Sequence, residues 1–413
     1  MLALLAARRF GPLFATQFLG AFNDNLFKTA FIFAVAFRWH ADDPLRAATM
    51  ATVATGVFIL PFFFLSGLAG AAADTRDKAW IARAVKLAEI GFMAIGAMAL
   101  WLDSEALSLV VIGLMGLHSA MFGPVKYAIL PQHLGQNELL AGTGLVEGAT
   151  FVAILLGQIA GGLLPVALVG PAALAVAVLG WGFSRAIPPA PPVVAGQPLD
   201  WNLWRTSRKA LSGVFSHRQL AVATLAISWF WALGAIFTSQ FVPLARNDLG
   251  GNEALATLFL AVFSVGVAAG STGVSKLLKG RITARLSAPA GLVMALAGLD
   301  LYFAEGAFAA LPAGDVRGFL ARPQGWRVMA DLLVLAIAGG VFSVPLYGIL
   351  QTKAPPGTAA QAIAANNIAN AGFQVAGVLA IGAALGRGAG VPVVLAGAGL
   401  TILLLLPLLR RLD

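Results

Sequence analysis

The segment Phe122-Gly-Pro-Val-Lys-Tyr-Ala-Ile-Leu130 ends an apolar stretch that covers residues 106–130. A related segment, Tyr347-Gly-Ile-Leu-Gln351, ends a second apolar stretch at 327–350. Tyr127 and Tyr347 are 220 positions apart, which is close to half of the 413-residue chain. This spacing predicts an internal repeat. In membrane proteins, two parallel repeats form two helix bundles with a binding site between them, near the middle of the bilayer.

The overall composition is that of a membrane protein. Hydrophobic residues make up 59% of the chain and charged residues 11%, whereas a soluble domain carries about 25% charged residues. The composition excludes a soluble globular protein, a disordered chain, a coiled coil and a nucleic-acid-binding domain. The chain has no cysteine, which excludes disulfides, thiol nucleophiles and cysteine-ligated metals. We expect no metal and no cofactor.

The apolar stretches are long enough to cross a bilayer, which takes about 20 residues of helix. Twelve such stretches are predicted at 10–37, 48–73, 79–102, 106–130, 139–168, 170–187, 218–245, 253–278, 283–305, 327–350, 358–385 and 389–409. The polar stretch between the sixth and the seventh begins with PPAPP, typical of a stiff linker, and continues with WNLWRTSRKALSGVFSH, which predicts an amphipathic helix at the membrane surface. The predicted fold is all-α, with six-helix bundles at 1–187 and 218–413 joined by a linker at 188–217.

The orientation follows from the distribution of basic residues. Most of the 27 lysines and arginines fall on the side of the membrane that holds both termini, and basic residues are enriched in cytoplasmic loops. We therefore expect a multi-pass protein with both termini in the cytoplasm. The net charge of +9 is mainly a signal of topology rather than of nucleic-acid binding.

The loop after the second stretch carries a candidate gate, in which glycine permits close helix approach and an aspartate can cap a neighbouring helix N-terminus. Its residues are Gly70, Asp74, Arg76 and Lys78. The alternative is a solvated loop whose charges only enforce topology.

Charged and amide side chains inside the spans are the sharpest signal, because each charge costs about 2.5–3.5 kcal/mol on insertion scales unless it faces a cavity or a partner. Asp24 and Lys28 share one face of the first span. They either neutralise each other or leave Asp24 and Asn25 to bind a headgroup or a coupling cation. Lys126 and Glu147 pair as a static bridge or open for a ligand that carries both charges.

A second polar stripe lies on the eleventh span, at i,i+4 spacing. We expect it to line the same cavity from the other half, rather than only to join two helices. The predicted substrate-binding residues are Asp24, Asn25, Lys126, Tyr127 and Glu147 in the first half and Asn366, Asn367, Asn370 and Gln374 in the second. His118 is more typical of a packing residue than of a proton carrier.

Several segments together resemble a known family. They are FATQFLGAFNDN at 14–25, FGPVKYAIL at 122–130, GLVEGATFVAILLG at 144–157, SWFW at 228–231, GVFSVPLY at 340–347 and ANNIAN at 365–370. The chain resembles the bacterial lysophospholipid transporters of the major facilitator superfamily, which occur alone or fused to acyltransferase and acyl-carrier-protein synthetase domains. The resemblance runs from the first span to the eleventh.

The resemblance implies a flippase of the bacterial inner membrane. It would carry lysophosphatidylethanolamine or lysophosphatidylglycerol from the outer to the inner leaflet by alternating access, for re-acylation by a separate acyltransferase or acyl-carrier-protein synthetase. It also implies a monomer. One departure is the seventh span, which holds no basic residue between Ser228 and Pro243, whereas some relatives place an arginine there.

Other functions compete with this one. An acyltransferase would need the motif His-x4-Asp, and none of His40, His118, His133 and His217 is followed by aspartate at that spacing; we therefore expect a transporter and no enzyme. A proton-coupled exporter of drugs or small solutes is the first alternative, with Asp24 and Glu147 as proton carriers. A non-transporting scaffold for a lipid-modifying enzyme is the second, with 201–217 as its docking surface.

Overall fold

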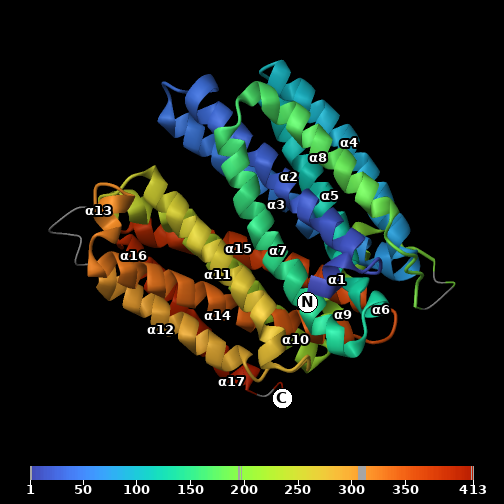
Figure 1. Cartoon of the computed structure of the whole chain (residues 1–413). Helices are drawn as coiled ribbons and strands as arrows, with labels where there is room; N and C mark the ends of the chain where they lie inside the picture. Colours follow the sequence, from blue (N-terminus) through green and yellow to red (C-terminus); the bar gives the residue numbers. More distant parts are fainter. Residues whose placement is uncertain (1, 194–195, 197, 306–312, 411, 413) are drawn as a thin grey trace.

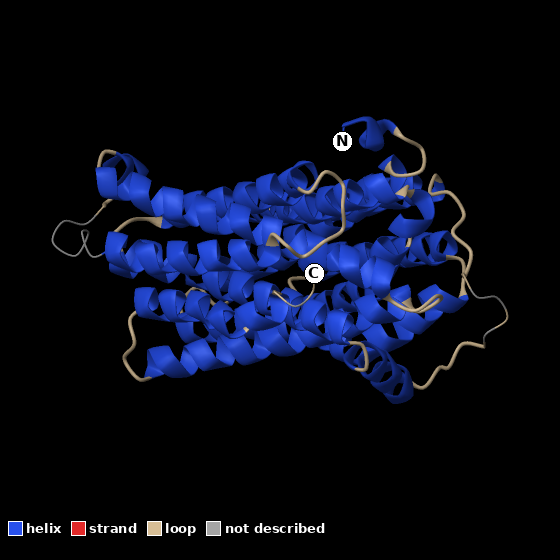
Figure 2. Cartoon of the chain, turned by 90° about the horizontal axis from the view of Figure 1, so that it is seen from below, coloured by secondary structure: helices blue, strands red, loops and turns tan. Residues whose placement is uncertain are grey.

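The computed structural model describes residues 2–193, 196, 198–305, 313–410 and 412, and every regular element among them is a helix (Figure 2). Parts of the predicted bundles (1, 306–312, 411 and 413) and of the predicted linker (194–195 and 197) lie outside the described residues. The first half contains α1 (Leu2–Ala6), α2 (Gly11–Ala34), a π-helical turn (Val35–Trp39), α3 (Pro44–Thr75), α4 (Lys78–Trp101), α5 (Glu105–Ala128), α6 (Leu130–His133), α7 (Gln136–Leu163) and α8 (Val166–Arg185).

The linker forms α9 (Leu203–Phe215). The second half contains α10 (Arg218–Pro243), a π-helical turn (Leu244–Asp248), α11 (Glu253–Leu277), α12 (Ser287–Glu305), α13 (Val316–Leu320), α14 (Pro323–Lys353), α15 (Ala359–Gly386), α16 (Val391–Leu400), a 3₁₀ turn (Thr401–Leu404) and α17 (Leu406–Leu409).

Among the described residues, each half contains six long helical segments, with the stretch from α16 to α17 counted as one. In the described part of the chain, eleven are long and apolar enough by length and composition alone. The twelfth is α2, whose polar centre lowers its hydropathy but which packs between α7 and α8. Glycines make that packing close, because a Cβ at Gly157 would lie 2.4 Å from the Phe22 carbonyl oxygen. The predicted all-α fold with two six-helix bundles is confirmed.

Proline explains two differences from the predicted spans. The fifth span was expected to continue to residue 168, but α7 ends at Leu163 and α8 begins at Val166. Pro165 disfavours the helical conformation in the residue before it, and Leu164 is extended, with ψ of 135°. The last span is a broken helix rather than one helix over 389–409, since Pro407 has no N–H to continue the α-helical ladder.

The two halves meet more closely at one end than at the other. Figure 1 shows α1, α6 and α9 together at one end of the bundle, which we call the linker end. A large cluster of buried apolar side chains joins both halves there and includes Phe122 and Tyr127 from the first half and Tyr347 from the second. A separate cluster around Phe27 and Met93 belongs to the first half alone. In the described part of the chain, the halves therefore share a core toward the linker end, and the first half has a second core of its own.

The predicted amphipathic linker helix is present as α9 and packs against α3 and α15, one helix from each half. Ser207 faces α3 so closely that a Cβ at Gly67 would lie 2.4 Å from the Ser207 nitrogen. Trp204 is 78% exposed. One face of α9 is thus fixed to the bundle, and the opposite face presents tryptophan at the surface.

Candidate substrate cavity

A cavity of about 260 Å³ lies between the two halves and is the candidate site. Its walls come from α2, α3, α4, α5 and α7 on one side and from α10, α14 and α15 on the other. The lining includes seven of the predicted substrate-binding residues, namely Asp24, Asn25, Lys126, Tyr127, Asn367, Asn370 and Gln374. Glu147 and Asn366 are fully buried behind the wall and do not line the cavity.

The carboxylate of Asp24 faces the cavity from the middle of α2 and accepts a hydrogen bond from the Ser119 hydroxyl of α5. Its predicted neighbour Lys28 lies one turn away, with its ammonium 4.9 Å from the centre of the Phe58 ring. Within the described residues, no carboxylate oxygen lies within salt-bridge distance of Lys28. The alternative in which Asp24 and Lys28 neutralise each other directly is therefore not what the structure has.

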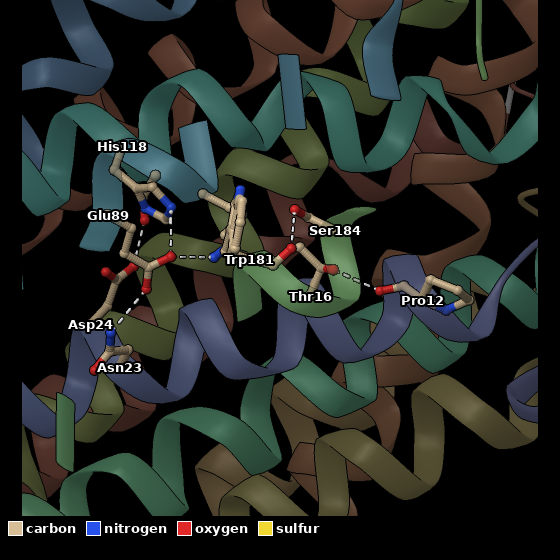
Figure 3. A network of polar contacts seen from close by, with 10 residues as sticks. Pro12, Thr16, Asn23, Asp24, Glu89, His118, Trp181 and Ser184 are labelled. Atoms are coloured by element: carbon tan, nitrogen blue, oxygen red, sulfur yellow. Dashed lines mark hydrogen bonds and ion pairs between the residues drawn. The ribbon is translucent and has the colours of Figure 1, made fainter. Parts of the chain in front are cut away.

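A buried polar cluster stands behind Asp24 (Figure 3). The Glu89 carboxylate accepts hydrogen bonds from Asn23 at 2.9 Å and from the Lys86 ammonium at 2.8 Å. His118 Nε2 lies 3.1 Å from the same carboxylate. The i,i+3 spacing of Lys86 and Glu89 on α4 was readable from the sequence, but the contribution of Asn23 and His118 from two other helices was not. The cluster ties α2, α4 and α5 together within one half.

The floor of the cavity is made by two tyrosines that occupy equivalent positions in the two repeats. The rings of Tyr127 and Tyr347 stack with centroids 4.7 Å apart and an interplanar angle of 9°. The Tyr127 hydroxyl donates a hydrogen bond to the buried carboxylate of Glu147. On the other side, Trp231 Nε1 donates to the Tyr347 hydroxyl at 2.8 Å. Each tyrosine is thus held by its own half, and the stack closes the cavity toward the linker end.

The predicted pair of Lys126 and Glu147 does not form an ion pair among the described residues, and one oxygen of Glu147 accepts the hydrogen bond of Tyr127 instead. Lys126 instead holds its ammonium 5.0 Å from the centre of the Tyr127 ring and lines the cavity. The sequence indicated the two charges as a pair but could not show that Tyr127 is the hydrogen-bond partner of Glu147. Lys126 therefore remains available to a ligand.

The amide stripe of α15 faces the first half, as predicted, although its members differ in accessibility. Asn367, Asn370 and Gln374 line the cavity. Asn370 accepts a hydrogen bond from the Ser228 hydroxyl at 2.8 Å. Asn366 is fully buried next to the wall. The second half thus presents neutral hydrogen-bonding groups to the charges of the first.

One side of the cavity is apolar. Phe58, Ile59 and Phe62 of α3 line it. Further along α15, five side chains are exposed, whereas Gly377 among them packs against Ile236 of α10; the exposed ones are Val375, Ala376, Val378, Leu379 and Ala380. The cavity therefore combines charged groups with an apolar side.

At the linker end, the predicted gate residues join the two halves. The Asp74 carboxylate accepts hydrogen bonds from the backbone N–H groups of Ala360 at 3.1 Å and Gln361 at 3.0 Å, at the N-terminus of α15. This is the helix-capping contact that the sequence indicated. A Cβ at Gly70 would lie 2.6 Å from the Ala364 Cβ. Arg76 is exposed and Lys78 is buried.

A second contact between the halves lies deeper. The Thr143 hydroxyl of α7 donates to Gln351 Oε1 of α14 at 3.0 Å, and both side chains are buried. Together with the tyrosine stack and the Asp74 cap, it closes the path from the cavity to the linker end. The structure is therefore closed at that end.

The comparisons with known proteins agree with one another. The family model of the Major Facilitator Superfamily matches residues 13–381. The chain is 27% identical over 375 residues to the protein named Lysophospholipid transporter LplT of Serratia proteamaculans (strain 568), covering 88% of this chain and 85% of that protein. It is 29% identical over 360 residues to the protein of the same name from Salmonella gallinarum, covering 85% of this chain and 82% of that protein.

Solved structures share the fold. The human organic anion transporter MFSD10 (TETRAN) superimposes with a TM-score of 0.76 and 16% identity, over 97% of this chain and 99% of that chain. A single-residue variant of the fucose:proton symporter FucP of E. coli superimposes with a TM-score of 0.71 and 13% identity, over 98% of each chain. These likenesses concern the arrangement of the helices.

Proposed function

Because this chain belongs to the Major Facilitator Superfamily, we propose that it is a lysophospholipid transporter of the bacterial inner membrane. It would move lysophosphatidylethanolamine or lysophosphatidylglycerol from the outer to the inner leaflet by alternating access of its two halves. A separate acyltransferase or acyl-carrier-protein synthetase would then restore the second chain. The similarity to proteins named as lysophospholipid transporters supports this choice of substrate.

The observation that carries the proposal is the amphiphilic character of the cavity. Lys126 and Asp24 offer an ammonium and a carboxylate, which suit the phosphate and the amine of a zwitterionic headgroup. Phe58 and Phe62 offer an apolar wall to a single acyl chain. The exposed side chains further along α15 would let the acyl chain remain in contact with lipid while the headgroup is bound.

Some of the predicted binding residues would contact the headgroup directly, and others would hold those residues in position. Asp24 and Asn25 would hold the amine, and Lys126 the phosphate. Tyr127 would form the floor on which the headgroup rests, and Glu147 would fix the orientation of that tyrosine from behind. The amides of the second half, Asn367, Asn370 and Gln374, would complete the shell, with Asn366 as a buried support.

The linker end would be the cytoplasmic side, in keeping with the predicted orientation, and the closed contacts would then define the outward-facing state. Gly70 and Asp74 would act as a latch, because the cap on α15 must break before the halves separate there. Arg76 and Lys78 would keep this loop in the cytoplasm. Release of the lipid into the inner leaflet would follow the opening of the latch.

A flipping assay tests the proposal. The protein is reconstituted in liposomes with fluorescent lysophosphatidylethanolamine in one leaflet, and protection from dithionite reports its movement, with a diacyl phospholipid as the control. We expect the protein to flip only the single-chain lipid. We also expect Asp24→Asn to slow flipping at least about tenfold, whereas Asp103→Asn, an exposed carboxylate paired with Arg38 outside the cavity, leaves it unchanged.

Other outcomes of these experiments would contradict the proposal or favour one of the two alternative functions. Equal flipping of both lipids, or of neither, would contradict the proposal. Uptake of small solutes that depends on a pH gradient would favour the proton-coupled exporter. A loss of association with a lipid-modifying enzyme after removal of α9, in a protein that flips no lipid, would favour the scaffold.

A further inference from the structure

The cavity carries three lysines, and they are not equivalent. The ammonium of Lys86 is fully buried and is neutralised by Glu89 at 2.8 Å. Lys28 and Lys126 are half-buried, line the cavity, and have no carboxylate within salt-bridge distance among the described residues. Of the carboxylates, only Asp24 belongs to the described lining. The cavity therefore holds more positive than negative charge and suits an anion, although a cation inside a membrane protein is costly without a partner.

The position of Lys28 is specific. It lies on α2, one turn or about 6 Å from Asp24 toward the end opposite the linker end. Lys126 lies on the other side of Asp24, since it is seven residues, or about 10 Å, beyond Ser119 toward the linker end. The two free ammonium groups thus flank the single cavity carboxylate along the axis of the bundle.

Lys28 lies between an apolar part and a polar part of the cavity lining. Its ammonium lies 4.9 Å from the centre of the Phe58 ring, on the apolar wall of α3. Its own helix carries the polar side chains of Asp24 and Asn25. In a lysophospholipid the phosphate is likewise the charged group nearest to the glycerol and the acyl chain, and the amine lies beyond it. Lys28 and Asp24 are therefore ordered along the cavity as the phosphate and amine are ordered along the lipid.

We propose that Lys28 is the entry site for the phosphate of the lipid and determines the specificity of the cavity for a phosphate attached to an acyl chain. The inference rests on the proposed function for the identity of the ligand. The phosphate is held first by Lys28 and the Phe58 wall, with the amine at Asp24. As the headgroup moves toward the floor, the phosphate passes to Lys126 while the amine keeps the same carboxylate.

Binding measurements on the purified full-length protein in nanodiscs test this assignment independently of transport. Radiolabelled lysophosphatidylethanolamine is displaced by lysophosphatidylglycerol, by monoacylglycerol of the same chain length, which lacks the phosphate, or by glycerol 3-phosphate, which lacks the chain. The variants are Lys28→Met and Lys28→Arg. Phe58→Leu keeps the lysine and removes the ring beside it.

We expect Lys28→Met to weaken the binding of both lysophospholipids at least about tenfold, as for loss of a hydrogen bond to a charged group, and to leave monoacylglycerol unchanged. Lys28→Arg should retain most of the affinity, and Phe58→Leu should lose a few-fold at most. Unchanged affinity for the lysophospholipids in Lys28→Met would overturn the proposal, as would an equal loss for all three lipids, which indicates a structural role.

Two further outcomes separate this inference from the proposed function. If glycerol 3-phosphate binds as tightly as the lysophospholipids, the ligand is a soluble phosphate ester, and the lipid assignment of Lys28 is wrong. If binding depends on Lys28 as expected but the wild-type protein flips no lysophospholipid in liposomes, the transport proposal fails while the binding site stands.

Discussion

The two halves of the protein each contribute one wall of the cavity, yet these walls differ in chemistry. In the described lining, the first half contributes the ionisable side chains of Asp24, Lys28, Lys86, His118 and Lys126. The polar lining of the second half consists of Trp231, Tyr347, Asn367, Asn370 and Gln374, none of which carries a formal charge. The charged side chains of the described lining thus belong to one of the two bundles.

This difference has a physical advantage in a protein that works by relative movement of its halves. Breaking a buried ion pair leaves an uncompensated charge and costs about 3–5 kcal/mol. The pair of Lys86 and Glu89 lies within the first half and moves as a unit with it. The contacts that cross between the halves near the floor include a ring stack and the neutral hydrogen bond of Thr143 with Gln351. These are cheaper to break and reform.

The largest effect is expected from removing the counter-charge of a buried lysine within the first half. Glu89→Gln would leave the fully buried ammonium of Lys86 without a counter-charge, so we expect a loss of about 3–5 kcal/mol in unfolding free energy. The double variant Lys86→Met/Glu89→Leu should recover most of that loss, because it removes both charges together. Unfolding of the purified protein by SDS in mixed micelles measures both. A single variant as stable as the wild type would show that this pair does not hold the first half together.

The next test targets the contact between the halves at the linker end. Gly70→Leu places a side chain where Ala364 and the Ala360 carbonyl leave no space, and overpacking typically costs about 1–3 kcal/mol. We expect Gly70→Leu to destabilise the closed form of the linker end by about that free energy, so that this end opens more often. Since the chain has no cysteine, a single Gln361→Cys reports opening through faster alkylation. Gly56→Leu is the matched control, because nothing lies within 4 Å of a Cβ there. Equal labelling in both variants would argue against Gly70 as a gate residue.

Sequence alone predicted the features that depend on position along one helix. The existence of the long apolar spans, the helix-capping contact of Asp74 and the cavity-facing side of α15 follow from periodicity, length and residue type, whereas the end of the fifth span and the break in the last one differ from the prediction. The choice of partner between helices did not follow, because it depends on how each helix is rotated against its neighbours. Asp24 bonds to Ser119 rather than to Lys28, and Glu147 to Tyr127 rather than to Lys126. Lys28 and Phe58 were therefore not recognisable as one site.

Equivalent tyrosines allow a direct comparison of the two halves. Tyr127→Phe removes the donor to the buried carboxylate of Glu147, and an unsatisfied buried group costs about 1–3 kcal/mol, with more for a charged one. Tyr347→Phe removes the neutral acceptor of a hydrogen bond from Trp231, which lines the cavity, so we expect about 0.5–1.5 kcal/mol. Thermal unfolding followed by tryptophan fluorescence measures the difference. Equal losses, or a larger loss for Tyr347→Phe, would contradict the functional asymmetry of the repeat.

The smallest effect is expected on the neutral wall. Asn367 lines the cavity from the second half opposite Gly123, and a Cβ on that glycine would lie 2.7 Å from its amide nitrogen. Asn367→Ala removes one neutral hydrogen-bonding group, worth about 0.5–1.5 kcal/mol, so lysophospholipid binding should weaken by roughly two- to tenfold. Because an amide has no formal charge, the loss should be equal for lysophosphatidylethanolamine and lysophosphatidylglycerol, whereas Asp24→Asn should affect the amine-bearing lipid more. Displacement assays with both lipids decide this. If the headgroup preference changes in Asn367→Ala and not in Asp24→Asn, the second half recognises the headgroup. The roles assigned to the two bundles would then be reversed.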